Sequence, residues 1–230
     1  MSASLLRETM LQQTSIPLQS GVRTVLVLAP HTDDAELGCG GTLSRFLEEG
    51  AVIVVAAFST AEESRPPGSE PGLLRREFLA SMRSMNIAES LTRVFDFPVR
   101  RFGDHRQNIL ESIFAMRRDF DPDIVLLPSG SDIHQDHQVI HAEGLRVFKE
   151  RTVWGYELPW NQIEFKAQAF VTLERRHLEV KWKAMQAYQS QIDLQRLYFA
   201  WHFVEGLARV RGVQIKSAYA EAFEVLRFKC

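Results

Sequence analysis

Two short polar clusters hold most of the side chains in this sequence that could do chemistry. The first is "HTDD", and the second lies within "HQDHQVIH". Their chemically active members are His31, Asp33 and Asp34 in the first, and His134, Asp136, His137 and His141 in the second. The chain has only seven histidines, so this concentration favours a metal site over isolated structural histidines. Imidazole nitrogens and carboxylate oxygens are normal ligands of tetrahedral zinc.

A catalytic zinc ion uses three protein ligands and leaves one position open. His31, Asp34 and His137 fill that number and leave His134 free. An alternative is the pair His137 and His141, whose i,i+4 spacing can bind zinc on a helix. If the helix starts near His137, His141 can equally lie behind the site or on the surface. Iron and cobalt also bind such ligand sets, so zinc is an inference from the residue types.

Asp33 lies next to a candidate ligand and is not needed to complete the set. Such a carboxylate could take a proton from water, which makes Asp33 the candidate general base.

Two other interpretations of the first cluster are weaker. The following "GCGGT" suggests a dinucleotide loop, but G-x-G-x-x-G would need glycine at Leu43, and the preceding acidic residues would repel a pyrophosphate. A solvated acidic turn that caps the next helix explains Glu36 but does not require His31. The backbone turn that brings the cluster together is expected from Pro30, Gly38, Gly40 and Gly41.

The elements that position these clusters follow a β-α-β-α order. Apolar runs rich in β-branched residues predict strands at 24–29, 52–58, 94–97 and 124–127. Segments of helical period predict helices at 41–49, 73–85, 107–120 and 138–149. This order predicts an α/β fold, a Rossmann-like three-layer sandwich with a mostly parallel sheet. Both clusters follow strand ends, where ligands of open α/β sheets bind.

The pattern changes after residue 149. Strand-like "TVWGYEL" and "AFVTL" precede predicted helices at 174–189 and 194–210 and a last strand at 222–227. We expect a single domain over 1–230, divided into an N-terminal extension 1–21, a Rossmann-like core 22–150 and a smaller C-terminal α+β extension 151–230 packed on the core.

Composition limits the class of protein. The 45% hydrophobic and 24% charged residues are typical of a globular protein. The net charge of −2 argues against a nucleic-acid binder. The two cysteines, Cys39 and Cys230, form no disulfide framework, and Cys39 is expected to be a buried small residue. The first residues do not resemble a signal peptide, and no apolar run could span a bilayer. We expect a cytoplasmic protein without membrane insertion; a homo-oligomer is compatible with this composition.

Three segments are candidates for substrate contacts. The Pro- and Gly-rich loop 59–72 is long enough to be a lid. The stretch "RFGDHRQN" offers Asp104, His105 and Asn108 to a sugar, although Asp104 also suits a helix cap. The aromatic residues of "VWGYELPWN" could stack on a sugar ring, but a role in the core or an interface is favoured.

The two clusters together resemble the LmbE-like, or PIG-L, family of zinc-dependent N-acetylglucosaminyl deacetylases. The family motif (A/P)-H-P-D-D-E is similar to "PHTDDAELGCGGT", and H-x-D-H is similar to "HQDH" at 134–137. With "AEAFEVLR" near the end, the resemblance spans roughly residues 22–228. Thr32 stands where the family usually has proline and Ala35 where it commonly has glutamate, and neither change removes a ligand or the base.

The resemblance implies a role for each matching residue. His31, Asp34 and His137 are implied to be zinc ligands, and Asp33 to be the general base. His134 is implied to be an imidazolium that stabilises the oxyanion or protonates the leaving amine, oriented by Asp136.

The family tends to carry R-x-x-E at the start of the helix after the long loop. In this chain Leu74 takes the arginine position when Glu77 is aligned, so Arg75 and Arg76 are the neighbouring candidates for sugar contact.

The resulting hypothesis is a zinc-dependent hydrolase that removes an N-acetyl group from a small amino-sugar compound of the N-acetylglucosamine type. One alternative is a zinc amidase that acts on another small-molecule amide or sugar conjugate. The other alternative is a metal- and sugar-binding domain without turnover, which would have no need of the non-ligand carboxylate of Asp33.

Overall fold

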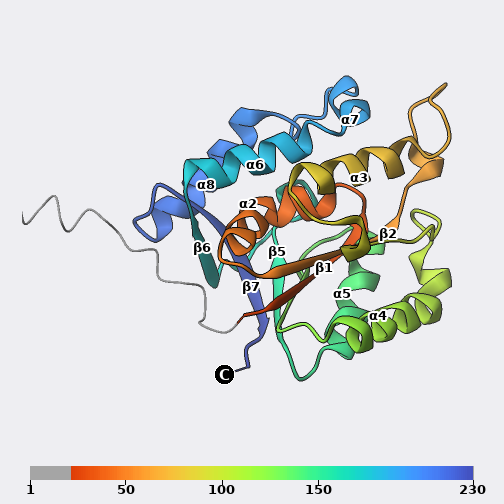
Figure 1. Ribbon diagram of the computed structural model, residues 1–230, viewed down its shortest axis with the longest axis horizontal. Coiled ribbons are helices and arrows are strands. Elements are labelled where there is room, and N and C mark those ends of the chain that lie inside the picture. The colour runs from red at the N-terminus through yellow and green to blue at the C-terminus, as the bar shows by residue number, and fades with distance from the viewer. Residues whose placement is uncertain (1–21, 230) are drawn as a thin grey trace, which may run out of the picture.

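The computed structural model describes residues 22–229, and a seven-stranded mixed sheet forms its centre (Figure 1). The strand order is β3-β2-β1-β4-β5-β7-β6. The strands are β1 (Thr24–His31), β2 (Val52–Ser59), β3 (Thr92–Val94), β4 (Ile124–Pro128), β5 (Thr152–Tyr156), β6 (Ala169–Leu173) and β7 (Tyr219–Arg227). The first five run parallel, and β7 pairs antiparallel with both β5 and β6.

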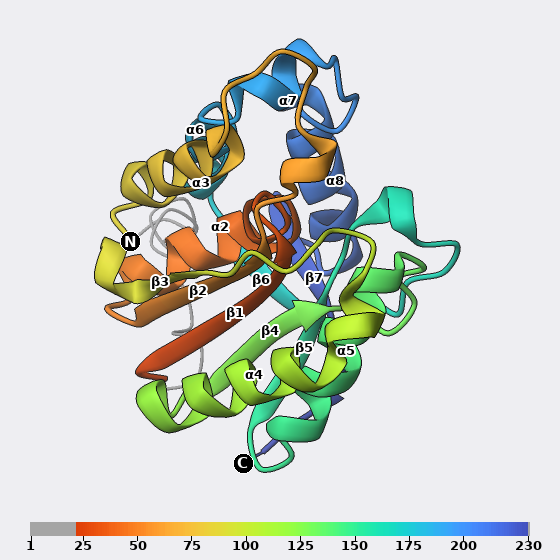
Figure 2. The same ribbon diagram turned by 90° about the vertical axis from the view of Figure 1, so that its right-hand side faces the viewer.

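Helices cover both faces of this sheet (Figure 2). The α-helices are α2 (Asp34–Glu48), α3 (Leu73–Ser84), α4 (Arg106–Phe120), α5 (Gln135–Val147), α6 (Arg175–Met185), α7 (Gln189–Asp193) and α8 (Trp201–Gln214). Short 3-10 turns lie at Glu62–Ser64, Glu89–Leu91, Phe102–His105 and Pro159–Asn161. Helices α2, α3, α6 and α8 pack on one face, and α4 and α5 on the other. The predicted α/β sandwich with a mostly parallel sheet is confirmed.

Strand β1 lies in the middle of the core. Val25 and Val27 point into one apolar layer, while Leu26 and Leu28 point into the other, and all four are fully buried. A parallel strand covered on both faces needs apolar residues at every position, which is why its sequence shows no alternation with polar residues.

The direction of the chain across the sheet reverses at β1. From β1 the chain moves outward to β2 and β3, then returns to place β4 on the other side of β1, with Val27 beside Leu126. The carboxyl ends of β1 and β4 therefore flank the topological switch point, where open α/β sheets bind ligands. Both polar clusters begin there.

The glycine-rich segment after β1 differs from the sequence prediction. Helix α2 begins at Asp34 instead of near residue 41 and is kinked at Cys39, whose φ of −146° is not helical. Gly38, Gly40 and Gly41 lie within α2 without positive φ angles. A Cβ at Gly41 would come within 2.6 Å of Leu173, so these glycines serve close helix packing and not a turn. Instead, the chain turns at Thr32 and Asp33.

Other predicted elements also have different bounds. The helix expected at 174–189 ends at Met185, and the last strand, expected at 222–227, begins at Tyr219. The strand expected at 94–97 lies at Thr92–Val94. The helix expected at 194–210 is wrong for 194–200, because α7 ends at Asp193, Gln195 adopts a left-handed φ of 53°, and α8 starts only at Trp201.

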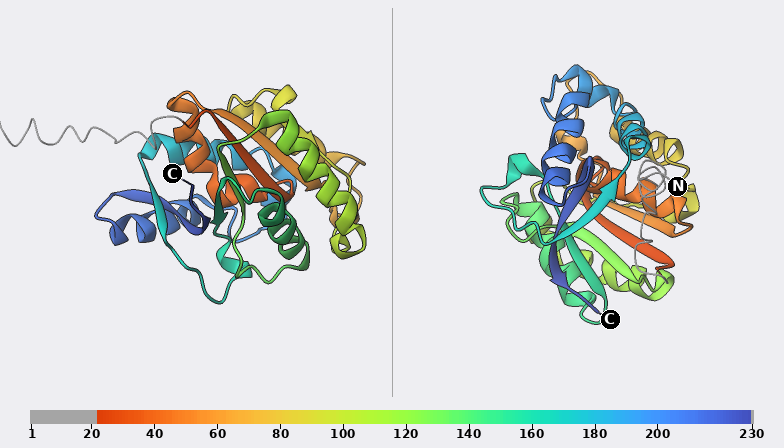
Figure 3. Two further views of the ribbon diagram at one scale, coloured as in Figure 1. Left: turned by 90° about the horizontal axis from the view of Figure 1, so that it is seen from below. Right: turned by 90° about the vertical axis from the view of Figure 1, so that its left-hand side faces the viewer.

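The C-terminal segment continues the same sheet through the pairing of β5 with β7 (Figure 3).

The expected extension at residues 1–21 lies outside the described residues. Within 22–229, no helix combines the length and the apolar character needed to cross a membrane.

Candidate metal centre

Three side chains from the two clusters meet at the switch point. His31 Nδ1 lies 3.2 Å from Asp34 Oδ2 and 3.2 Å from His137 Nε2, and the remaining distance, from His137 Nε2 to Asp34 Oδ2, is 3.3 Å. His31 ends β1, Asp34 starts α2, and His137 lies in the first turn of α5. The predicted ligand set is therefore brought together as a nearly equilateral triangle of ligand atoms.

Two buried carboxylates accept hydrogen bonds from the ring nitrogens of His31 and His137 that point away from the triangle. The His31 Nε2–H donates to Asp136 Oδ2 at 3.1 Å, and the His137 Nδ1–H donates to Asp132 Oδ2 at 2.7 Å. These tautomers are assigned because an ionised carboxylate can only accept. Each histidine therefore turns its remaining nitrogen lone pair towards Asp34.

This arrangement fits a tetrahedral metal ion. Metal–ligand distances of 2.0–2.1 Å place tetrahedral ligand atoms about 3.3 Å apart, which is close to the observed 3.2–3.3 Å. Histidines that bind metal usually donate their other ring N–H to a carboxylate or carbonyl, as His31 and His137 do. Without a cation, protons on these nitrogens take its place, since the hydrogen bonds to Asp34 help raise the pKa of both histidines.

The electrostatics of the cluster also favour a cation. Burial would lower the pKa of His137, but the carboxylates of Asp34 and Asp132 outweigh it and raise the pKa to about 10. Burial also acts to lower the pKa of His31, but the hydrogen bonds to Asp136 and Asp34 raise it. Two histidines with raised pKa values lie in a strongly negative environment, which a divalent ion would neutralise.

Asp33 occupies the N-cap position of α2, but its side chain makes no cap hydrogen bond. It borders the cavity described below and is half-buried. Burial, followed by the charge of Asp34, raises the pKa of Asp33 to about 6. The two adjacent aspartates are therefore in different environments: Asp34 points into the triangle, while Asp33 remains available to a ligand.

The predicted pairing of Asp136 with His134 is wrong. The Asp136 carboxylate accepts from His31 Nε2 and from the backbone N–H of Arg100, because it is fully buried behind His31. His134 Nδ1 instead accepts the Asp136 backbone N–H at 3.2 Å, which leaves the proton of the neutral ring on Nε2. Burial and the charges of the other histidines lower the pKa of His134, which favours the neutral ring over the expected imidazolium.

His134 also lies close enough to join a metal-binding group, since one ring nitrogen from each of His31, His134 and His137 falls within 4.8 Å of the others. The set with Asp34 is tighter, and the Nδ1 of His134 is already used as an acceptor. His141 donates its Nδ1–H to the Pro128 carbonyl at 2.8 Å and takes no part in the triangle.

Asp132 was not predicted to belong to the site. Its carboxylate is almost fully buried. Besides orienting His137, its other oxygen accepts the His134 backbone N–H at 2.9 Å. Its position two residues before His134 was the only signal in the sequence, and the histidines beside it obscured its role.

A cavity of about 350 Å³ opens beside the triangle. This volume lies within the range of small-molecule sites. Loop 59–72, predicted to be a lid, contributes Ala61 and Ser64, and the predicted aromatic segment contributes Trp160 and Asn161. Further lining residues were missed because they come from the end of α7 and the connection to α8: Gln191, Arg196 and Tyr198.

The five predicted sugar contacts do not line this cavity. Arg75 lies near Asp96, Arg76 donates to the Pro71 carbonyl, and Asp104 lies near Arg101, while His105 and Asn108 lie at the start of α4. Helix α3 turns Leu74 inward instead, so its arginines project to the surface.

A buried hydrogen-bond group supports the turn between His31 and Asp34. The Tyr188 hydroxyl contacts the Thr32 carbonyl at 2.5 Å and Glu36 Oε1 at 2.7 Å, and Ser81 donates to the same oxygen of Glu36. Glu36 is fully buried, so its interpretation as a solvated helix cap is wrong. Cys39 is also fully buried, as expected, and its thiol donates to the Ala35 carbonyl.

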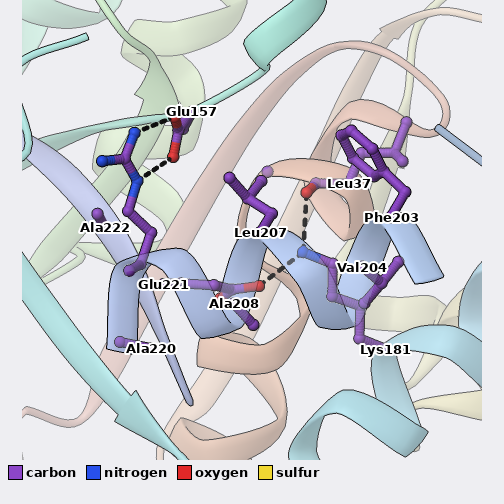
Figure 4. A pocket seen from close by; sticks show the side chains of 12 residues that line it. Leu37, Glu157, Lys181, Phe203, Val204, Leu207, Ala208, Ala220, Glu221 and Ala222 are labelled. Atoms are coloured by element: carbon purple, nitrogen blue, oxygen red, sulfur yellow. Dashed lines mark hydrogen bonds and ion pairs between the residues drawn. The ribbon is translucent and has the colours of Figure 1, made fainter. Parts of the chain in front are cut away.

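A second pocket, under α8, differs from the cavity in its charges (Figure 4). Lys181 donates to Glu221 Oε1 at 2.7 Å and to the Leu37 carbonyl, and Arg211 pairs with Glu157. At about 20 Å³ this pocket has room for about one water molecule. Its charged groups satisfy one another, which indicates a structural role.

Comparison with known proteins finds relatives of this chain. The family model described as "PIG-L: GlcNAc-PI de-N-acetylase" matches residues 26–148, more than half of the chain. The uncharacterized deacetylase YaiS of Escherichia coli (strain K12) is 25% identical over 177 residues, which cover 72% of this chain and 90% of that protein.

Solved structures show the same fold at low identity. N,N'-diacetylchitobiose deacetylase from Pyrococcus horikoshii has a TM-score of 0.75 and 18% identity, covering 98% of this chain and 93% of that chain. GalB, the 4-carboxy-2-hydroxymuconate hydratase from Pseudomonas putida KT2440, has a TM-score of 0.70 and 19% identity, covering 90% and 98%. The fold therefore occurs with more than one named activity.

Asp132→Asn is expected to weaken zinc binding about 10- to 100-fold, because the amide can donate to His137 Nδ1 and move the ring proton to Nε2, the ligand atom. Competition with a chromophoric chelator measures this affinity. Asp104→Asn, which changes an exposed carboxylate, is the matched control. Equal zinc affinity in the Asp132 variant and the wild type would contradict this role.

Tyr188→Phe is expected to lower the free energy of unfolding by about 1–3 kcal/mol, because the Thr32 carbonyl and Glu36 lose a buried donor. Denaturant titration measures the change. Tyr198→Phe is the control, since the Tyr198 hydroxyl has no hydrogen-bond partner among residues 22–229. A Tyr188 variant as stable as that control would show that this group contributes nothing.

Proposed function

Because the chain belongs to the PIG-L family of de-N-acetylases, we propose that it hydrolyses the N-acetyl group of a small N-acetylglucosamine-type amino sugar. The observation that carries this proposal is the triangle of His31 Nδ1, Asp34 Oδ2 and His137 Nε2 beside a cavity of about 350 Å³. The products are acetate and the free amine.

We propose that His31, Asp34 and His137 hold one divalent ion, with zinc as the first candidate. Such an ion, when bound, lowers the pKa of water to about 7 and polarises the acyl oxygen. The support for this ligand set is the match between its spacing and tetrahedral coordination. The hydrogen bonds from His31 to Asp136 and from His137 to Asp132 would hold both rings in place.

Asp33 is proposed as the general base. Its carboxylate borders the cavity, forms no cap hydrogen bond and has a pKa raised to about 6, so it is ionised at neutral pH yet basic enough to take a proton from water. As the water oxygen bonds to the acyl carbon, Asp33 accepts one proton. When the C–N bond breaks, that proton goes to the amine nitrogen.

His134 is proposed to stabilise the oxyanion. The backbone N–H of Asp136 fixes the neutral tautomer that carries its proton on Nε2, and the ring borders the cavity. A neutral donor that is already oriented can bond to the developing negative charge without reorganisation. Asp136 is proposed to act on His31, so it positions a ligand and does not touch the substrate.

Other activities remain distinguishable by experiment. An amidase that cleaves a different small amide would use the same residues on another acyl acceptor. A binding domain without turnover would not depend on Asp33. The fold of the named hydratase is also shared, so release of acetate, and not the fold, identifies the reaction.

Asp33→Asn is expected to keep the metal while acetate release falls about 100-fold or more, because the amide cannot accept the water proton. Elemental analysis measures the metal content. A screen over free, phosphorylated, nucleotide-linked and lipid-linked N-acetylhexosamines, with zinc added back, measures acetate. Asp104→Asn is the control, with unchanged release. An active Asp33 variant would exclude this base, and a wild type that releases no acetate from any of these compounds would refute the proposed function.

A further inference from the structure

The connection between α7 and α8, residues 194–200, carries polar groups that have no partner among residues 22–229. Arg196 is the only lysine or arginine among the residues that line the cavity. Its guanidinium forms no ion pair or hydrogen bond within residues 22–229, and it is exposed. The Tyr198 hydroxyl, two residues later, is likewise unpaired in that part of the chain.

Both ends of this connection are fixed. The Glu77 carboxylate accepts from Ser190 N at 2.8 Å and from Ser190 Oγ at 2.6 Å, which ties the start of α7 to α3. At the other end, the ring of Tyr198 stacks on Trp160, with centroids 4.0 Å apart and an interplanar angle of 12°. Arg196 is therefore carried by a segment that is anchored on both sides, with its charge left for a ligand.

The cavity has charges of opposite sign in different parts of its wall. Asp33 and Asp34 lie towards the triangle, and Arg196 lies in the wall formed by the connection. Burial raises the pKa of Tyr198 to about 12, with Asp33 adding to the rise and Arg196 opposing it, so both charges act on this hydroxyl. In the pocket under α8, by contrast, Arg211 is already paired with Glu157 (Figure 4).

We propose that Arg196, with the Tyr198 hydroxyl, binds an anionic group of the substrate, a phosphate or a carboxylate carried by the part of the molecule beyond the acylated amino sugar. The proposal rests on the proposed deacetylation. The acetamido group faces Asp33 and His134 while the anion lies at Arg196. A guanidinium presents several N–H donors in one plane and suits the paired oxygens of such groups.

Calorimetric binding to metal-free protein tests this inference, because it separates Arg196 from any anion held by the metal. The ligands are N-acetylglucosamine, its 1-phosphate and its carboxymethyl glycoside, at one fixed low ionic strength. We expect the wild type to bind at least one anionic ligand about 10-fold more tightly than the neutral sugar. The comparison between the phosphate and the carboxylate identifies which anion fits.

Arg196→Gln is expected to remove that preference and to bind the neutral sugar as the wild type does. Arg118→Gln, which changes an exposed arginine of α4 outside the cavity, is expected to keep the preference. No preference in the wild type, no detectable binding of either anionic ligand, or a preference that survives in Arg196→Gln would each overturn the inference.

The anion site and the proposed deacetylase activity can fail independently in these experiments. If acetate is released equally well from neutral and anionic substrates and Arg196→Gln changes neither rate, the deacetylase stands and the anion site is wrong. If the anionic ligands bind through Arg196 but no N-acetyl compound releases acetate, the anion site stands and the deacetylase is wrong.

Discussion

The candidate centre depends on two hydrogen bonds from histidine to buried carboxylate. Asp136 accepts from His31 Nε2, and Asp132 accepts from His137 Nδ1. Because each bond fixes one ring proton, the other nitrogen of each histidine presents its lone pair to the position that Asp34 also faces. A side-chain rotation or a change of tautomer at either histidine would remove one corner of the triangle, so the carboxylates determine whether the site exists.

The fold supplies the positions for these bonds. His31 ends β1, and His137 lies in the first turn of α5, the helix that follows β4. The adjacent parallel strands β1 and β4 flank the switch point of the sheet. The Tyr188 hydroxyl holds the Thr32 carbonyl inside the turn that separates His31 from Asp34. The glycines of α2 let that helix pack closely, so Asp34 at its first position is held in place.

The sequence predicted the parts of the structure that depend on local pattern. The apolar run of β1 and the β-α-β-α order predicted the fold, and the clustering of His31, Asp34 and His137 predicted which side chains would meet. The roles of Asp132 and Asp136 were not predictable, because either carboxylate could pair with several nearby histidines until the backbone directions were known. Arg75 and Arg76, predicted to contact a sugar, do not line the cavity, because one residue of helical rotation exchanges the inward Leu74 for outward arginines. Arg196 was missed because it comes from a segment that had been predicted to be helical.

The most direct test of this account is ¹⁵N NMR of the histidine rings in chelator-treated and zinc-loaded protein. In the zinc-loaded protein we expect His31 to carry its proton on Nε2 and His137 on Nδ1, with the large zinc-dependent shifts on His31 Nδ1 and His137 Nε2. His134 is expected to remain protonated on Nε2 without a ligand shift. Zinc-dependent shifts on His134, or a proton on His31 Nδ1 or His137 Nε2 in the presence of zinc, would contradict the account.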